Sequence, residues 1–133
     1  MRIDQYISSS RVIDLSSQDL KTAYAELLAT FKNLLPSPQS RKKVLTELIT
    51  REQAITSYLG EGVALPHSRV KMKRPFALAI GRCPTGLSFE GQGSYDEIRY
   101  VFLLLASENA KNYLSFLATL ARTFQDKSAM DHL

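Results

Sequence analysis

The sequence of 133 residues has one cysteine, no tryptophan, and no apolar run long enough to cross a lipid bilayer. The single cysteine, Cys83, excludes an intramolecular disulfide and fits a reducing compartment, so we expect a cytoplasmic protein with no direct membrane insertion. The first thirty residues lack the apolar core of a secretion signal. A chain of this length buries roughly two thirds of its unfolded surface without disulfides or metals. We therefore expect a single domain over residues 1–133.

The sequence also lacks the patterns of common cofactor and metal sites. Its two histidines do not combine with the cysteine or with carboxylates at zinc-ligand spacings. It contains no P-loop, no dinucleotide fingerprint and no Gly-x-Ser-x-Gly element. We interpret Cys83 as a buried thiol without a catalytic role, because no second cysteine or paired base accompanies it. The sequence therefore predicts no metal and no cofactor.

The formal net charge is +4, and the positive residues are unevenly spread. Four of them follow His67 closely, namely Arg69, Lys71, Lys73 and Arg74. We interpret this cluster as a solvated loop, although it could also attract an anionic ligand or an acidic patch on a partner. No interleaved aromatic platform or recognition-helix pattern accompanies it, so nucleic acid is not an expected partner.

Two helices are predicted before residue 55. Ser16, followed by Asp19, has the form of a capping box, and apolar residues then recur at helical spacing over 20–35. Ser37 and a first-turn proline predict the start of the second helix. Arg51 lies at the C-terminal end of that helix, where the helix dipole favours a cation.

Strands and a closing helix are predicted in the rest of the chain. The strand-like runs are 12–15, 63–65, 76–83 and 98–106, with 87–89 as a possible short edge strand and turns at 84–86 and 91–93. The run 101–105 is apolar throughout, which indicates a central strand covered on both faces. Helical spacing returns over 113–124. The order of elements predicts an α/β fold with a mixed sheet of about four to five strands flanked by helices.

The most informative histidine is His67, which follows a proline at the end of a short apolar run. Arg51 stands sixteen positions before it, and two hydroxyl residues and two glycines lie between them. Imidazole is a nucleophile that can attack phosphorus near neutral pH. A histidine in this place could also be a strand-end residue hydrogen-bonded to a backbone carbonyl.

A phosphoryl group on this histidine would need groups that stabilise its oxygens. Arg51 could neutralise one oxygen with its planar guanidinium, and Thr56 or Ser57 could donate a hydroxyl hydrogen bond. Backbone N–H groups of a turn could bind the remaining oxygens, because glycine lets a backbone approach an anion closely. This turn consists of Gly60, Glu61 and Gly62.

The segment 51–68 resembles the phosphorylation-site segment of the type-2 EIIA proteins of the bacterial phosphotransferase system. These proteins include mannitol- and fructose-specific IIA domains and the nitrogen-regulatory IIA protein. Those proteins carry an acidic or amide residue, six variable positions, an aliphatic-Gly step, and then aliphatic-Ala-aliphatic-Pro-His. Here the matching positions are Glu52, Leu59-Gly60 and the run 63–67. Ser68 departs slightly, because the family usually has an even smaller residue there.

The resemblance covers nearly the whole chain and implies the EIIA type-2 fold. It implies that His67 accepts a phosphoryl group from a histidine phosphocarrier protein, and that the spacing of Arg51 is that of the family's arginine. In the family the group passes on to an EIIB protein or stays as a regulatory mark. The resemblance also implies a final C-terminal helix, which is either missing or lies beyond Leu133.

One position departs from the family in a way that bears on function. The family commonly opens the helix after the hydrophobic strand with a histidine and a leucine, where this chain has Tyr113 and Leu114. The other histidine, His132, does not align there, and we interpret it as a solvated tail residue. We expect phosphorylation to remain possible with Tyr113 beside His67, but transfer to an EIIB protein to be slow.

Three functions are open at this point. The first is a regulatory IIA protein of the nitrogen-regulatory kind, which would control a partner such as a transporter or a kinase. The second is a sugar-specific IIA component that passes phosphate to an EIIB protein. The third is a regulatory binding module, attached to a transporter or a transcription regulator, that has kept the fold without being phosphorylated. The sequence favours the first, because Tyr113 replaces the family's second histidine.

Overall fold

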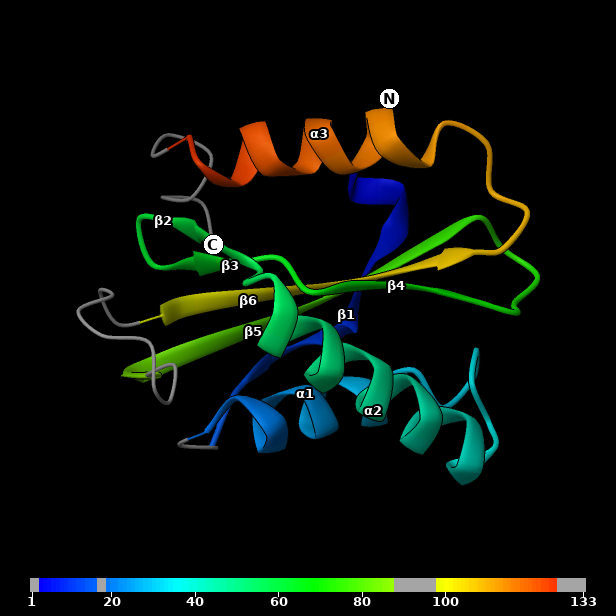
Figure 1. The fold of residues 1–133 in the computed structure, drawn as a ribbon, viewed down its shortest axis with the longest axis horizontal. Helices are drawn as coiled ribbons and strands as arrows, with labels where there is room; N and C mark the ends of the chain where they lie inside the picture. The colour runs from blue at the N-terminus through cyan, green and yellow to red at the C-terminus, as the bar shows by residue number, and fades with distance from the viewer. Residues whose placement is uncertain (1–2, 17–18, 88–97, 127–133) are drawn as a thin grey trace.

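The computed structural model describes residues 3–16, 19–87 and 98–126 (Figure 1). Within these ranges, the helices are a 3-10 helix η1 (Ile3–Tyr6) and the α-helices α1 (Leu20–Ala29), α2 (Pro38–Ala54) and α3 (Tyr113–Phe124). The strands are β1 (Ile7–Asp14), β2 (Tyr58–Gly60), β3 (Val63–Ala64), β4 (His67–Val70), β5 (Phe76–Leu87) and β6 (Ile98–Ser107).

The strands form one mixed sheet in the order β1-β5-β6-β3-β2, and β4 also pairs with β6. Strand β6 runs antiparallel to β5 and parallel to both β3 and β4, while β1 runs parallel to β5. The predicted mixed sheet is therefore confirmed, with six described strands instead of four to five. The unpredicted strands β2 and β4 have three and four residues, which is too short for a clear periodic signal.

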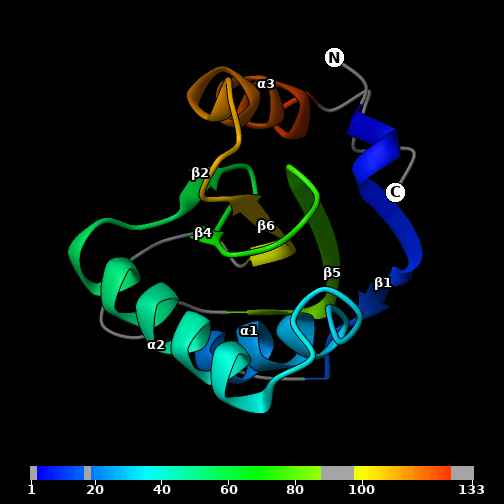
Figure 2. The ribbon, with the colours of Figure 1, turned by 90° about the vertical axis from the view of Figure 1, so that its right-hand side faces the viewer.

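Helices cover both faces of the sheet. Figures 1 and 2 show α1 and α2 on one side of it and α3 on the other. Successive residues of β6 point to opposite faces, so Val101, Leu103 and Leu105 pack in the α1/α2 core, whereas Phe102 and Leu104 pack in the α3 core. All five side chains are fully buried, which confirms that this run is a central strand covered on both faces.

The predicted boundaries of the first helix are wrong at both ends. Asp19, and not Ser16, is the N-cap, and its carboxylate accepts a hydrogen bond of 2.8 Å from the backbone N–H of Thr22. Aspartate caps a helix as well as serine does, and it stands directly before the first apolar residue. The helix ends at Ala29, where the N–H groups of Thr30 and Phe31 bond to carbonyls three residues back. Phe31 and Leu35 still pack in the same core. Apolar spacing therefore continued past the end of the helix.

The second helix starts as predicted, but the turn predicted at 84–86 is wrong. Ser37 caps α2 by accepting a hydrogen bond from the backbone N–H of Ser40. Strand β5 continues through residues 84–86, and its pairing with β6 shifts register between Arg82 and Leu87. Proline and glycine there form an irregularity within the strand and not its end. Residues 88–89 and 91–93, where we predicted an edge strand and a turn, lie outside the described residues.

Candidate functional site

The site is built around His67, the first residue of β4. Its backbone pairs with Leu104 of β6, the middle strand of the sheet order, so the sheet holds this position firmly. The side chain is half-buried, and Nδ1 lies 2.9 Å from the carbonyl oxygen of Leu65. A carbonyl can only accept a hydrogen bond, so Nδ1 carries the proton and Nε2 keeps its lone pair in the neutral ring. The backbone contact that marks a structural histidine therefore also leaves one nitrogen free to react.

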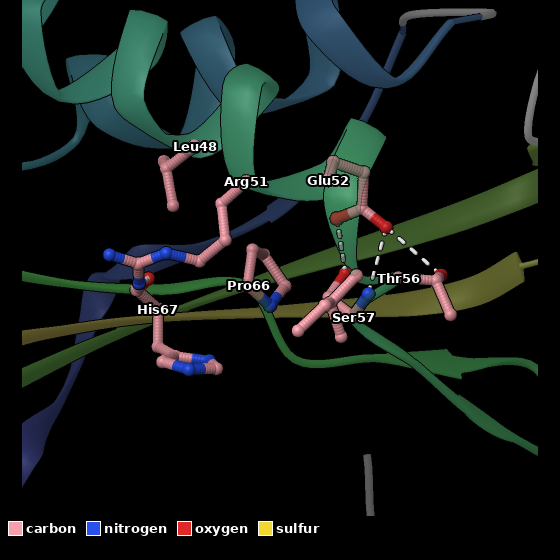
Figure 3. A pocket seen from close by; sticks show the side chains of 8 residues that line it. Leu48, Arg51, Glu52, Thr56, Ser57, Pro66 and His67 are labelled. Atoms are coloured by element: carbon pink, nitrogen blue, oxygen red, sulfur yellow. Dashed lines mark hydrogen bonds between the residues drawn. The ribbon is translucent and has the colours of Figure 1, made fainter.

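Arg51 reaches this histidine from the last turn of α2, which confirms its predicted place at the helix end. Its Nη1 donates a hydrogen bond of 2.7 Å to the carbonyl oxygen of His67. Figure 3 shows the guanidinium at the backbone of His67, while the imidazole points away from α2. The guanidinium is exposed and has five donors, so it can hold β4 with one and still bind an anion with the others.

The predicted hydroxyls of Thr56 and Ser57 line the same hollow as His67, but they point to the carboxylate of Glu52 (Figure 3). Both hydroxyls donate a hydrogen bond to the carboxylate of Glu52. The distance is 3.0 Å from Oγ1 of Thr56 to Oε2 and 2.7 Å from Oγ of Ser57 to Oε1. The carboxylate also accepts from the backbone N–H of Ser57 at 2.8 Å and from the hydroxyl of Tyr24 at 2.8 Å. Burial, and secondarily the charge of Glu52, raises the pKa of Tyr24, so its hydroxyl stays protonated as a donor.

Two hollows meet at His67. One of about 150 Å³ lies on the α2 side and is lined by Leu48, Arg51, Glu52, Ile55, Thr56, Ser57, Pro66 and His67. The other, of about 320 Å³, extends toward α3, where Leu114 and Leu117 contribute to its wall. Thr56, Ser57 and His67 line both hollows. The Glu52 network thus fixes the segment that separates them.

The turn Gly60-Glu61-Gly62 is not brought to His67. All three residues have left-handed backbones, with φ of 92°, 55° and 77°, and the N–H of Gly62 donates to the hydroxyl of Tyr58. Val63, next to the turn, pairs with Tyr100 of β6, whereas His67 pairs with Leu104. Four residues of strand separate these two levels by about 13 Å. A phosphate-binding role for this turn stays a prediction that the geometry does not favour.

Tyr113, at the position where the resembled family commonly has a histidine, does lie beside His67. The two ring centroids are 6.3 Å apart, with the ring planes at 59°. Burial raises the pKa of the Tyr113 hydroxyl, and the positive charges of Arg51 and Arg69 partly offset this effect. The hydroxyl is therefore a neutral group at physiological pH.

Arg69 was missed as a residue of this site. The sequence placed it in a solvated loop, but residues 67–70 form β4. Alternation along a strand puts His67 and Arg69 on the α3 face, while Ser68 bonds Glu47 of α2 and Val70 packs in the α1/α2 core. The guanidinium of Arg69 lies 4.8 Å from the ring centroid of Tyr113. The two-residue spacing from His67 could have placed Arg69 on the same face as His67. That inference needed β4 to be predicted as a strand, and it was not.

Across 3–16, 19–87 and 98–126, no group of three or more histidine, cysteine or acidic side chains is placed to hold a metal ion. Across the same ranges, none of the helices combines the length and the apolar character needed to span a membrane.

Sequence comparison places residues 9–133 in the family described as "Phosphoenolpyruvate-dependent sugar phosphotransferase system, EIIA 2". A nitrogen regulatory protein of Bradyrhizobium diazoefficiens is 35% identical over 109 residues, which are 80% of this chain and 69% of that protein. The fructose-specific EIIABC component of Bacillus subtilis is 26% identical over 128 residues, which are 90% of this chain but only 19% of that protein.

Solved structures share the fold. The nitrogen regulatory protein IIA-Ntr from Neisseria meningitidis superposes with a TM-score of 0.79 at 27% identity, covering 95% of this chain and 86% of that one. The mannitol IIA protein from Escherichia coli superposes with a TM-score of 0.67 at 18% identity, covering 91% of this chain and 84% of that one. The second of these supports the fold alone.

Proposed function

Because this chain belongs to the EIIA 2 family of the phosphoenolpyruvate-dependent sugar phosphotransferase system, we propose that it accepts a phosphoryl group on Nε2 of His67 from a histidine phosphocarrier protein. The observation that carries this proposal is the hydrogen bond between Nδ1 of His67 and the carbonyl oxygen of Leu65. It assigns the proton to Nδ1 and leaves the lone pair of Nε2 as the nucleophile.

The transfer balances without a further reactant. The lone pair of Nε2 attacks phosphorus while the P–N bond to the carrier's protonated phosphohistidine breaks. The carrier's ring leaves with the bonding pair as a neutral imidazole, and the positive charge passes to the ring of His67. The carbonyl of Leu65, which accepts from Nδ1, stabilises that charge, because hydrogen bonds to charged donors are the stronger ones.

Arg51 is the best-placed group for the phosphoryl oxygens. Charge spreads over three equatorial oxygens in such a transition state, so positioning and electrostatic stabilisation dominate catalysis. The guanidinium already lies at the backbone of His67 and keeps further donors. The hydroxyls of Thr56 and Ser57 could also serve, but only after leaving the carboxylate of Glu52.

We favour a regulatory role over sugar transport. The relative at 35% identity is a nitrogen regulatory protein, and Tyr113 stands beside His67 where the family commonly has a histidine. In this role the phosphorylation state of His67 would control a partner, such as a transporter or a kinase, in the cytoplasm. The alternative is a sugar-specific IIA component that delivers phosphate to an EIIB protein, which the likeness to a fructose-specific component supports.

The test is incubation with phosphoenolpyruvate, enzyme I and a histidine phosphocarrier, followed by intact mass measurement. We expect one added phosphate, its loss on brief acid treatment and its survival in alkali. His67→Ala should abolish the label, whereas His132→Ala, which changes the chain's other histidine, should keep it.

Retention of the label by His67→Ala would refute the site. An acid-stable, alkali-labile label would indicate a hydroxyl such as that of Ser57 or Ser68. No label on the native protein would favour a binding module that has kept the fold without being phosphorylated.

A further inference from the structure

Arg69 makes an unusual set of contacts for an exposed cation. One nitrogen, Nη2, lies within hydrogen-bond distance of three backbone carbonyls at the end of β6 and in the loop that follows, those of Ser107 (3.4 Å), Glu108 (3.0 Å) and Ala110 (3.1 Å). The same guanidinium lies over the ring of Tyr113, 4.8 Å from its centroid. A single side chain of β4 therefore contacts both the β6–α3 loop and Tyr113, the first residue of α3.

The start of α3 benefits from these contacts, because the helix has few stabilising groups at its own N-terminus. Its N-cap, Asn112, has a left-handed backbone with φ of 61° and makes no side-chain capping hydrogen bond. The first turn contains no acidic residue that would interact favourably with the helix dipole. Typical caps satisfy free N–H groups of the first turn and fix how the chain enters the helix. Here the bonds from Arg69 fix the loop instead.

We propose that Arg69 is a positioning residue that holds the ring of Tyr113 beside His67 and thereby limits access to the imidazole. The arrangement of the side chains supports this. Arg69 and His67 share one face of β4, and the ring of Tyr113 contacts both of them from α3. A guanidinium suits the task better than an ammonium, since its plane can stack on an aromatic ring while its edge donates to carbonyls.

The proposal deepens the function proposed above and rests on it for one consequence. With the Tyr113 ring fixed beside His67, water reaches a phosphoryl group on this histidine less readily, so the phosphorylated state lasts longer. A long-lived mark suits a regulator. The structural part does not depend on phosphorylation, because access to the imidazole can be measured by a small chemical probe.

The first experiment acylates the folded protein with diethyl pyrocarbonate and measures modification of His67 by peptide mass. Arg69→Lys keeps the positive charge but loses the planar fork, so we expect His67 to react at least about threefold faster. Tyr113→Ala should accelerate it similarly, and adding Arg69→Lys to Tyr113→Ala should change little, because residues that act through one another are not additive. Tyr113→Phe keeps the ring and should react at nearly the native rate.

The matched control is Lys73→Gln, which removes another exposed cation of the same segment and should leave the rate unchanged. Circular dichroism and urea unfolding establish that each variant is folded. A native rate in Arg69→Lys overturns the proposal, as does an equal acceleration by Arg69→Lys with and without Tyr113. If Arg69→Lys does not fold, a native rate in Tyr113→Ala overturns it instead.

The second experiment measures the decay of phosphorylated His67 at fixed pH. We expect a half-life about threefold shorter in Arg69→Lys than in the native protein and an unchanged one in Lys73→Gln. An equal half-life in Arg69→Lys and the native protein would refute the consequence for phosphate. If the native protein takes up no phosphate, the proposed function fails, while the acylation rates still decide the role of Arg69.

Discussion

The carboxylate of Glu52 offers a sharp test of how the site is held. It is buried and accepts four hydrogen bonds, two of them from Ser57 and one each from Thr56 and Tyr24. These bonds join α1, the end of α2 and the segment that lines both hollows beside His67. Removing the carboxylate should therefore weaken the fold and loosen the site together.

The expected cost depends on what replaces the carboxylate. Glu52→Ala leaves the backbone N–H of Ser57 and the fully buried hydroxyl of Tyr24 without this acceptor, although the hydroxyl keeps a contact of 3.2 Å with Ser57. An unsatisfied buried group costs about 1–3 kcal/mol, so we expect a loss of about 3 kcal/mol in the free energy of unfolding.

A glutamine should be tolerated much better. Its oxygen can face the N–H of Ser57 and the hydroxyl of Thr56, while its NH₂ faces the hydroxyls of Tyr24 and Ser57, which can turn to accept. The remaining loss is the difference between charged and neutral hydrogen bonds, offset by easier burial of an uncharged group. We expect Glu52→Gln to cost about 1 kcal/mol.

Urea unfolding measures these differences, provided that the slope with urea stays constant among the variants. Tyr24→Phe alone should cost about 1–2 kcal/mol, and it should add little to Glu52→Ala because the two groups are partners. Two results would refute the reasoning: a glutamine variant as unstable as the alanine variant, or full additivity of Tyr24→Phe and Glu52→Ala.

Three further predictions concern the site and the core. Arg51→Lys keeps the charge but loses bidentate geometry, so phosphorylation should slow clearly while the free energy of unfolding changes by less than about 1 kcal/mol; equal loss of rate and of folded protein would make Arg51 a structural residue. Tyr113→His should speed transfer to an EIIB protein about tenfold, or about 1.4 kcal/mol of barrier, and native transfer already as fast as that of a histidine-bearing relative would favour sugar transport. Burial raises the pKa of Cys83 from 9.0 to about 11, so a disulfide reagent at pH 8 should label the native thiol about a hundredfold more slowly than the unfolded one. The stability that comes from keeping this thiol protonated is present below pH 9 and is lost as the pH rises toward 11. Rapid labelling of the native protein would contradict the raised pKa.

Long periodic elements were predictable because their signals are repeated many times along the chain. The apolar run of β6, the start of α2 at Ser37 and the helix from Tyr113 all lie where the sequence placed them. Boundaries were less predictable. Phe31 and Leu35 keep helical spacing beyond the end of α1, because they fill the same core from a different backbone.

Some residues of the predicted motif meet in the structure, and others do not. His67 and Arg51 are sixteen positions apart in the sequence, yet they are joined by a hydrogen bond. The glycine turn at 60–62 is nearer to His67 in the sequence, but the extended chain between them carries it away along β6. Spacing predicted that these residues belong to one motif, but it could not predict which of them meet.

The sequence by itself determined the family, the mixed α/β class and His67 as the candidate nucleophile, because these depend on residue types in a fixed local order. Only the tertiary structure decided which nitrogen of His67 is free, that the hydroxyls of Thr56 and Ser57 donate to Glu52, and that the guanidinium of Arg69 lies over the ring of Tyr113. The physical reason is that β4 is four residues long and is held in place by pairing with β6. Its alternation, which sends His67 and Arg69 to the α3 face, exists only once the sheet has formed.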